Sequence, residues 1–304
     1  MSRNPFPYKH DEWAAGHGDV LKHVILHTVL VEQQKAHQQE GILLVDCMAG
    51  DGVYDLNQHD QPLAYQKGIV RVLERCANQP AHVPPAVQSF VQTVYAATGC
   101  TTAQDLDVYP GSPVLGQHVL RDRGIDAHRL LDQFVDEVQW LSENSVFRPG
   151  LNAFDTQTSM EFILPYTNHD DDEQQHPVIL IDPSYESDSD YGNVKRLVTT
   201  ILEQHPYATI VVWMPYLQHH PLRFSFPTSM RELAKKHAKG GRYFGSITIA
   251  KDGYQGSCVL VCNPTAGMDD ILDEDLLHWL ANTMNMGKDE FMVEQFMKKK
   301  KVKA

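Results

Sequence analysis

The chain has 304 residues, of which 42% are hydrophobic, and this is enough for the core of one large domain or two small ones. Its formal net charge of −13 opposes long-range attraction to phosphate, so contact with nucleic acid would need a local basic segment such as the lysine-rich tail at 298–303. The five cysteines are scattered and form no C-x-x-C pair, so the sequence suggests neither a disulfide framework nor a zinc site and favours free thiols. No apolar run reaches the roughly 18 residues that span a bilayer, and residues 1–8 lack the pattern of a signal peptide.

The first half of the chain has four clear segments. They are, in order, a helix at residues 18–39, a buried strand at 42–46, a helical stretch at 57–106 and a helix opened by Ser112 and Pro113. Apolar residues that recur every three or four positions predict the helices, and a continuous apolar run predicts the strand. Because the helical stretch has no strand signal, we expect a helical insertion at about 57–108.

Strands and helices alternate in the second half of the chain. The predicted strands are residues 126–131, 178–181, 208–212, 245–249 and 258–261, and the predicted helices are 134–143, 160–164, 194–203, 230–239 and 272–284. This alternation predicts a doubly wound, Rossmann-like α/β sheet whose two closing strands form an antiparallel edge. We therefore expect a segment of residues 1–40 with the first helix, an α/β domain at 41–290 and a basic tail at 291–304.

A glycine turn follows the first predicted strand, in the run Asp46-Cys-Met48-Ala-Gly50-Asp-Gly52. Glycines let the backbone approach a ligand closely, and this spacing suits S-adenosylmethionine better than a dinucleotide, whose motif has a third glycine. Asp132 ends the strand predicted at 126–131 and could accept hydrogen bonds from the ribose of the same ligand. The alternative is a tight turn and an ordinary carboxylate at a helix N-terminus.

The run Asp182-Pro183-Ser184-Tyr185 carries the strongest functional signal. It follows a continuous apolar strand directly, which places it at the carboxyl end of a strand, where open α/β sheets bind ligands. A carboxylate and the Pro183 carbonyl can each accept one N–H of an exocyclic base amine and draw its lone pair toward a methyl donor. An aromatic ring such as that of Tyr185 can stack on the flipped base. The alternative is a turn without a chemical role.

Polar and aromatic side chains also gather ahead of the first strand. Tyr8, Lys22 and His23 belong to this group, and we favour a lid or substrate contact over plain helix surface as their role. The histidines of this region do not have the spacing of a tight metal-binding motif, so we expect no metal.

Five segments occur in an order that resembles the bacterial RlmJ family, which methylates adenine N6 in 23S ribosomal RNA. They are residues 8–23, 44–52, 109–113, 180–186 and 253–264. The runs Asp19-Val-Leu-Lys-His23 and Tyr109-Pro-Gly-Ser-Pro113 are the most specific to it. The resemblance implies an S-adenosylmethionine-dependent methyltransferase fold with a small inserted helical subdomain.

The resemblance also implies roles by position. Asp182 falls at the catalytic acid, Tyr8 at the tyrosine that meets the RNA and Tyr185 at the base-stacking aromatic. Together with the glycine turn, the expected cofactor-binding residues are Lys22, His23, Asp46, Met48, Gly50, Gly52, Ser112, Asp132, Asp155, Thr156 and Asp182. Four positions depart from the family pattern: Met48 replaces a histidine, Asp132 a glutamate, Thr156 a glycine and Ser184 the second proline of the motif.

The sequence thus predicts N6-methylation of an adenine in 23S ribosomal RNA, naked or partly assembled, by a cytoplasmic monomer that uses S-adenosylmethionine. The expected catalytic residues are Asp182, Pro183 and Tyr185, and the expected substrate contacts are Tyr8, Lys22 and Tyr185. Two alternatives stay open. One is a non-catalytic RNA- or donor-binding relative, such as an assembly factor, whose binding would not depend on Asp182. The other is a methyltransferase that acts on DNA or another RNA, because the motif recognises a base and not its polymer.

Overall fold

The computed structural model describes residues 13–38, 41–50, 52–57, 64–120, 128–130, 176–185, 187–217, 221–222, 225–248 and 254–284. The helices predicted at 134–143 and 160–164 and the basic tail lie outside these ranges. Within the described part of the chain, no helix is both long enough and apolar enough to cross a lipid bilayer.

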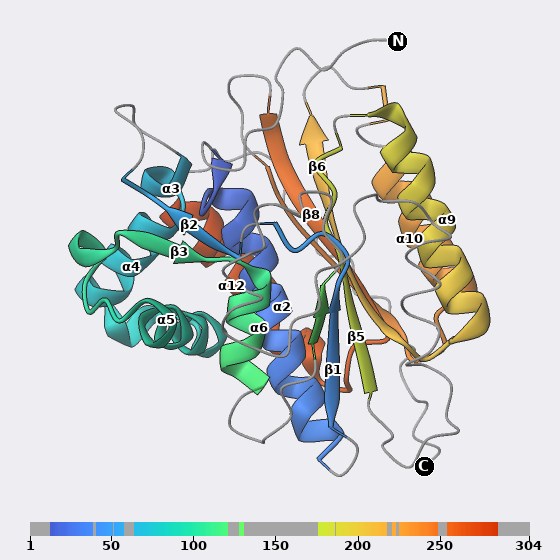
Figure 1. Ribbon diagram of the computed structural model, residues 1–304, viewed down its shortest axis with the longest axis horizontal. Coiled ribbons are helices and arrows are strands. Elements are labelled where there is room, and N and C mark those ends of the chain that lie inside the picture. The colour runs from blue at the N-terminus through green and yellow to red at the C-terminus, as the bar shows by residue number, and fades with distance from the viewer. Residues whose placement is uncertain are drawn as a thin grey trace.

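The core of the molecule is a six-stranded sheet (Figure 1). Its strands lie in the order β4 (His128–Leu130), β1 (Ile42–Asp46), β5 (His176–Ile181), β6 (Thr209–Leu217), β8 (Tyr254–Cys262) and β7 (Arg242–Thr248). Strands β4, β1, β5 and β6 are parallel to one another, whereas β8 is antiparallel to both β6 and β7. The predicted antiparallel edge is therefore confirmed, and β8, the last strand among the described residues, lies between β6 and β7.

Helices cover both faces of this sheet, which confirms the doubly wound architecture (Figure 1). One face carries α2 (His17–Ala36), α6 (Ser112–Leu120) and α12 (Glu274–Thr283), and the other carries α9 (Asp188–Gln204) and α10 (Ser225–His237). In β5, Val178 and Leu180 join the hydrophobic core on the α2 face, and Ile179 and Ile181 join the core under α9 and α10. Alternate residues of a strand point to opposite faces, so a continuous apolar run suits a sheet that is covered on both sides.

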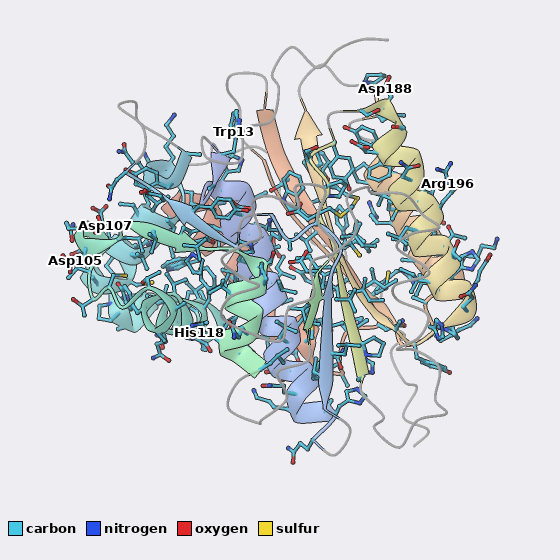
Figure 2. The ribbon with its side chains drawn as sticks, viewed as in Figure 1. Trp13, Asp105, Asp107, His118, Asp188 and Arg196 are labelled. Carbon is cyan, nitrogen blue, oxygen red and sulfur yellow. The ribbon has the colours of Figure 1, made fainter. Side chains whose placement is uncertain are left out.

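Helix α9 shows how local sequence fixes an element. Ser187 and Asp190 form a capping box at its start, which satisfies backbone N–H groups that have no partner within the helix. Val194 is buried toward the sheet, whereas Asp188 and Arg196 lie on the outer side of the helix (Figure 2). The amphipathic pattern thus decides which face of α9 packs on β5 and β6.

The predicted insertion is helical and lies beside α2, α6 and α12 (Figure 1). It consists of α3 (Ala64–Lys67), α4 (Ile69–Asn78), η1 (Pro80–His82), α5 (Pro85–Thr98) and η2 (Ala103–Asp105). Two short antiparallel strands, β2 (Val53–Asp55) and β3 (Val108–Pro110), flank it on either side in the sequence. Neither strand is expected from the sequence, because three residues carry too little periodicity to be recognised.

Candidate active site

The carboxyl ends of β1 and β5 form a topological switch point. The chain passes from β1 to β4 on one side and then reaches β5 on the other, so the loops after β1 and β5 lead in opposite directions. The two ends stay close, because the Cys47 N–H donates to the Leu180 carbonyl oxygen over 2.9 Å. Asp46 ends β1 and Asp182 follows β5. The sheet therefore brings together two carboxylates that belong to motifs far apart in the sequence.

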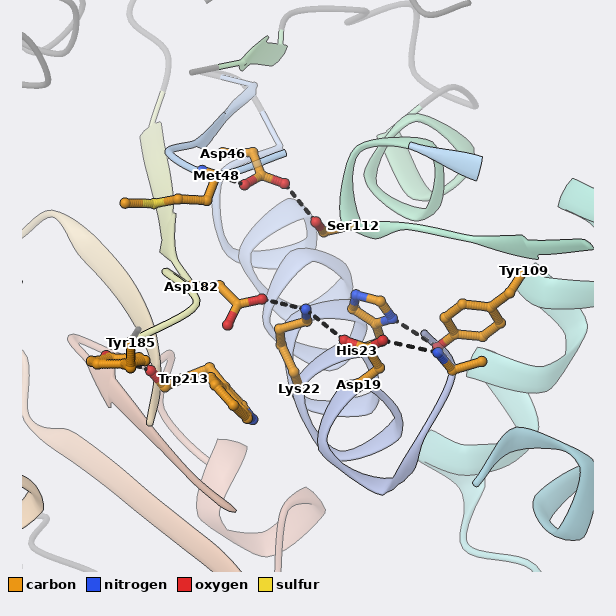
Figure 3. A network of polar contacts seen from close by, with 11 residues as sticks. Asp19, Lys22, His23, Asp46, Met48, Tyr109, Ser112, Asp182, Tyr185 and Trp213 are labelled. Atoms are coloured by element: carbon orange, nitrogen blue, oxygen red, sulfur yellow. Dashed lines mark hydrogen bonds and ion pairs between the residues drawn. The ribbon is translucent and has the colours of Figure 1, made fainter. Parts of the chain in front are cut away.

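Asp46 holds the turn after β1 in place. Its carboxylate is buried, and its Oδ1 accepts the Met48 N–H over 3.2 Å while its Oδ2 accepts the Ser112 hydroxyl over 2.6 Å (Figure 3). Gly50 and Gly52 have φ values of 60° and 75°, in the left-handed region that favours glycine. Gly50 and Gly52 thus have the backbone conformations that the predicted glycine turn needs, and Asp46 ahead of them is tied to the first residue of α6.

His23 has a buried nitrogen without a partner. Its Nδ1 lies 2.7 Å from the Tyr109 hydroxyl, and the two rings stack with centroids 5.6 Å apart. Its Nε2 is buried and has no hydrogen-bond partner among the described residues, and in the view of Figure 3 it is turned toward Ser112. Burial, reinforced by the charge of Lys22, lowers the pKa of His23 to about 3, so the imidazole is neutral at pH 7. An unpaired buried nitrogen is costly, and it fits a ligand that would supply the missing hydrogen bond.

Lys22 lies between the carboxylates of Asp19 and Asp182 (Figure 3). Its Nζ donates to Asp182 Oδ2 and lies 2.8 Å from Asp19 Oδ1, and all three side chains are largely buried. Burial raises the pKa of Asp182 to about 7; Lys22 opposes this shift, and the carboxylates of Asp19 and Asp46 add to it. Asp182 Oδ1 has no hydrogen-bond partner among the residues that the structure describes. Asp182 therefore combines a free acceptor oxygen with proton exchange near neutral pH.

Tyr185 is not open to solvent. Its ring packs against Tyr191 and Phe226, with centroids 4.9 Å and 5.8 Å away, and its hydroxyl donates to the Trp213 carbonyl oxygen over 2.8 Å. Its φ of 54° lies in the left-handed region, which is uncommon for a residue with a large side chain. The ring is covered in this conformation, so stacking of Tyr185 on a base stays a prediction.

The other predicted site residues divide into two groups. Pro183 is buried beside Asp182, at the end of β5 where the motif predicts it. Tyr8, Asp132, Asp155 and Thr156 lie outside the described residues. The structure also adds Asp19, which the sequence does not single out for chemistry. In the ranges described, no three His, Cys, Asp or Glu side chains are grouped so that they could hold a metal ion.

Comparison with known proteins gives a consistent assignment. A family model described as ribosomal RNA large subunit methyltransferase D, RlmJ, matches residues 39–295. Two proteins named ribosomal RNA large subunit methyltransferase J are similar over nearly their whole length. The one from Escherichia coli is 24% identical over 287 residues, which cover 91% of this chain and 93% of that protein. The one from Haemophilus influenzae is 23% identical over 295 residues, with the same coverage of 91% and 93%.

A crystal structure of a Legionella pneumophila protein has the same fold. It matches with a TM-score of 0.73 at 19% identity and covers 94% of this chain and 99% of its own. The sheet order and the switch-point site described above agree with a Rossmann-like methyltransferase fold. Since the family model covers far more than half of the sequence, the chain belongs to the ribosomal RNA large subunit methyltransferase family RlmJ.

Proposed function

We propose that the chain transfers a methyl group from S-adenosylmethionine to N6 of an adenine in 23S ribosomal RNA. Family membership supports a methyltransferase of large-subunit ribosomal RNA. The single observation that carries the finer assignment is the Asp182 carboxylate. It lies at the switch point, with Oδ2 bound by Lys22 and with Oδ1 unpaired among the described residues.

The chemistry of an exocyclic amine explains why such a carboxylate is needed. The adenine N6 lone pair is delocalised into the ring, so the amine is a poor nucleophile until hydrogen bonds to its N–H groups localise that pair. Asp182 Oδ1 would accept one N–H and the Pro183 carbonyl oxygen the other, which orients the lone pair toward the donor. Because its pKa is raised to about 7, Asp182 can also take up the proton that the amine loses.

The described residues fit the methyl donor. S-adenosylmethionine, when bound, supplies an activated methyl group on a sulfonium centre. His23 Nε2 is a buried nitrogen without a partner, and the Gly50–Gly52 turn lets the backbone approach a ligand. Asp46 and Ser112 are bonded to one another, so in our proposal they shape the loop that contacts the donor. Donor contacts by Asp132, Asp155 and Thr156 remain part of the proposal.

Substrate binding completes the proposal. Lys22 would keep Asp182 Oδ2 occupied and so leave Oδ1 for the base, and Tyr8 would meet the RNA. Tyr185 would stack on the flipped adenine after its neighbours uncover it. The protein would act as a cytoplasmic monomer on naked or partly assembled ribosomal RNA.

The test is transfer of labelled methyl from S-adenosylmethionine to unmodified 23S ribosomal RNA by the wild type and by Asp182→Asn. We expect N6-methyladenosine as the product and a loss of at least about 100-fold in the variant, because the acceptor for the amine proton is gone. Asp105→Asn is the matched control, since Asp105 is exposed on the outside of the insertion (Figure 2). Calorimetry with S-adenosylmethionine should show unchanged donor binding in Asp105→Asn, and in Asp182→Asn it separates a contribution of Asp182 to donor binding from its role as the acceptor of the amine proton.

Each other outcome identifies a different error. Full activity in Asp182→Asn would mean that another group accepts the amine proton. Donor binding without incorporation into 23S ribosomal RNA would indicate a different acceptor, DNA or another RNA, or a non-catalytic relative. Absence of donor binding in the wild type would contradict the cofactor assignment itself.

A further inference from the structure

We propose that Asp19 is a positioning residue of this active site, and that it makes Lys22 share its charge between two carboxylates, so that Asp182 is only partly neutralised. This inference rests on the proposed function, in which Asp182 accepts the amine proton. Lys22 Nζ lies 2.8 Å from Asp19 Oδ1 and also donates to Asp182 Oδ2. The relative exposure of the three side chains is between 8% and 15%, so water screens their charges weakly.

Asp19 is itself held firmly in place. While its Oδ1 faces Lys22, its Oδ2 accepts the Ala15 N–H over 2.9 Å. Ala15 is fully buried with a φ of 59°, and its carbonyl oxygen accepts the Ile69 N–H over 3.0 Å, at the start of α4. The carboxylate is therefore fixed from the backbone before α2 and, through Ala15, from the helical insertion. A side chain fixed in this way can orient a flexible lysine.

The two carboxylates respond oppositely to their surroundings. Burial acts against the charged form of Asp19, but the charge of Lys22 and hydrogen bonds from Lys22 and Ala15 lower its pKa below the usual value. Burial raises the pKa of Asp182, although Lys22 opposes the shift, and the carboxylates of Asp19 and Asp46 raise it further. Burial raises the pKa of Tyr185 well above its usual value, and the charge of Asp182 adds to this shift. Asp19 thus keeps its charge, while Asp182 gains and loses a proton.

Loss of the Asp19 charge should make Asp182 a weaker proton acceptor. Lys22 would then interact with one carboxylate in place of two, and a negative charge near Asp182 would be gone. Both changes favour the ionised form of Asp182 and lower its proton affinity. A residue that only supported the fold would not produce a shift in this direction.

The same helix offers a matched control. Glu32 and Lys35 of α2 form an ion pair with the i,i+3 spacing of Asp19 and Lys22, and their closest atoms are 2.6 Å apart. This pair does not contact Asp182. Glu32→Gln therefore removes an acid from a lysine on α2 and leaves the active site unchanged.

The experiment measures the titration of Asp182 in the full chain by carbon-13 NMR of labelled aspartate carboxyl groups. Its signal is assigned by its loss in Asp182→Asn. In Asp19→Asn we expect the midpoint to fall by about one pH unit, with no change in Glu32→Gln. Asp19→Ser is a second neutral variant that keeps an oxygen for the Ala15 N–H, and Asp19→Glu keeps the charge and should restore the wild-type midpoint. The acidic limb of the pH profile of methyl transfer should move in the same direction.

The outcomes separate this inference from the proposed function. An unchanged Asp182 midpoint in both neutral variants would overturn the role of Asp19. If the Asp182 midpoint shifts in the Asp19 variants but the wild type methylates no 23S ribosomal RNA, the proposed substrate is rejected and the coupling of Asp19, Lys22 and Asp182 is upheld. An equal shift in Glu32→Gln would also overturn the proposal, because the effect would then be a general one of charge on α2.

Discussion

The tyrosine that follows Ser184 is fixed by its backbone and by its hydroxyl. Tyr185 has a φ of 54°, and its Oη donates to the Trp213 carbonyl oxygen in a buried environment. Tyr185→Phe would keep the ring packing and leave that carbonyl oxygen without its donor. We expect the free energy of unfolding to fall by about 1 kcal/mol in urea denaturation. Tyr207→Phe, on an exposed ring, is the control and should be neutral. Equal stability of the two variants would contradict this role for the hydroxyl.

Ser112 tests the other half of the site at the same scale. Its hydroxyl donates to Asp46 Oδ2 over 2.6 Å, and both residues are buried. Ser112→Ala would leave a buried carboxylate oxygen short of a donor, so we expect a loss of about 2 kcal/mol in stability and weaker binding of S-adenosylmethionine in calorimetry. The control is Ser229→Ala, whose hydroxyl bonds within α10. Unchanged donor affinity in Ser112→Ala would separate this loop from the cofactor site.

The sequence predicts some residues of the candidate site and misses others. Asp46 and Asp182 are predictable because each comes at the end of an apolar run, and parallel strands align their carboxyl ends. Asp19 is not, because an acid in the first turn of a helix is ordinary and Asp182, to which it is linked through Lys22, lies 163 positions away. The burial of Tyr185 is equally hidden, since it depends on how α9 and α10 pack over the loop after β5.

At the scale of elements, the insertion docks through a glycine. A Cβ on Gly68 would lie 2.2 Å from the Ala15 carbonyl oxygen, which accepts the Ile69 N–H. Gly68→Ala should therefore push the insertion away from α2, lower the free energy of unfolding by about 2 kcal/mol and, because Ala15 also binds Asp19, reduce methyl transfer. Thermal denaturation and the transfer assay would measure both effects.

Gly192 of α9 provides the matched substitution. A Cβ at this position meets no atom within 4 Å, and glycine is a poor residue for a helix interior. Gly192→Ala should thus raise the free energy of unfolding by about 0.5–1 kcal/mol. If both alanine variants gained stability, close packing at Gly68 would be excluded as the way the insertion docks.

The elements also show where local pattern fails. The strand at Ile42–Asp46 is found as predicted, because an apolar run bounded by Gly41 has no competing interpretation. Strand β6 continues to Leu217, well beyond the predicted end at 212. Pro215 makes a long strand look improbable, but the ladder with β8 accommodates it at an irregularity between Pro215 and Leu217. Pairing with a distant strand decides this boundary, and that information is not local.

At the scale of the whole molecule, buried histidines make the fold sensitive to acid. Burial lowers the pKa of His17 and His27 to about 4 and that of His23 to about 3. Below about pH 6.5 the unfolded chain binds protons that the folded chain does not, so stability falls as the pH drops toward 4. Asp182 acts oppositely, since its raised pKa makes the folded chain keep a proton between about pH 4 and pH 7. Because three histidines oppose one aspartate, we expect the free energy of unfolding to fall between pH 7 and pH 4.

His27 allows this balance to be tested away from the active site. Its Nε2 lies 2.9 Å from the Thr93 hydroxyl of α5, and glutamine could keep a hydrogen bond there. We expect His27→Gln to reduce the loss of stability between pH 7 and pH 5 by about 1 to 2 kcal/mol in urea denaturation. If His27→Gln lost as much stability between pH 7 and pH 5 as the wild type does, His27 would not be neutral in the folded protein.

The order in which the strands leave the ribosome differs from their order in the sheet. Strand β8 is made last, yet it lies between β6 and β7, and β7 joins the sheet only through β8. Until residues 254–262 have been synthesised, β6 therefore has an unpaired apolar edge that can associate with other nascent chains. A premature stop before this segment is expected to yield an aggregating fragment and not a shorter enzyme.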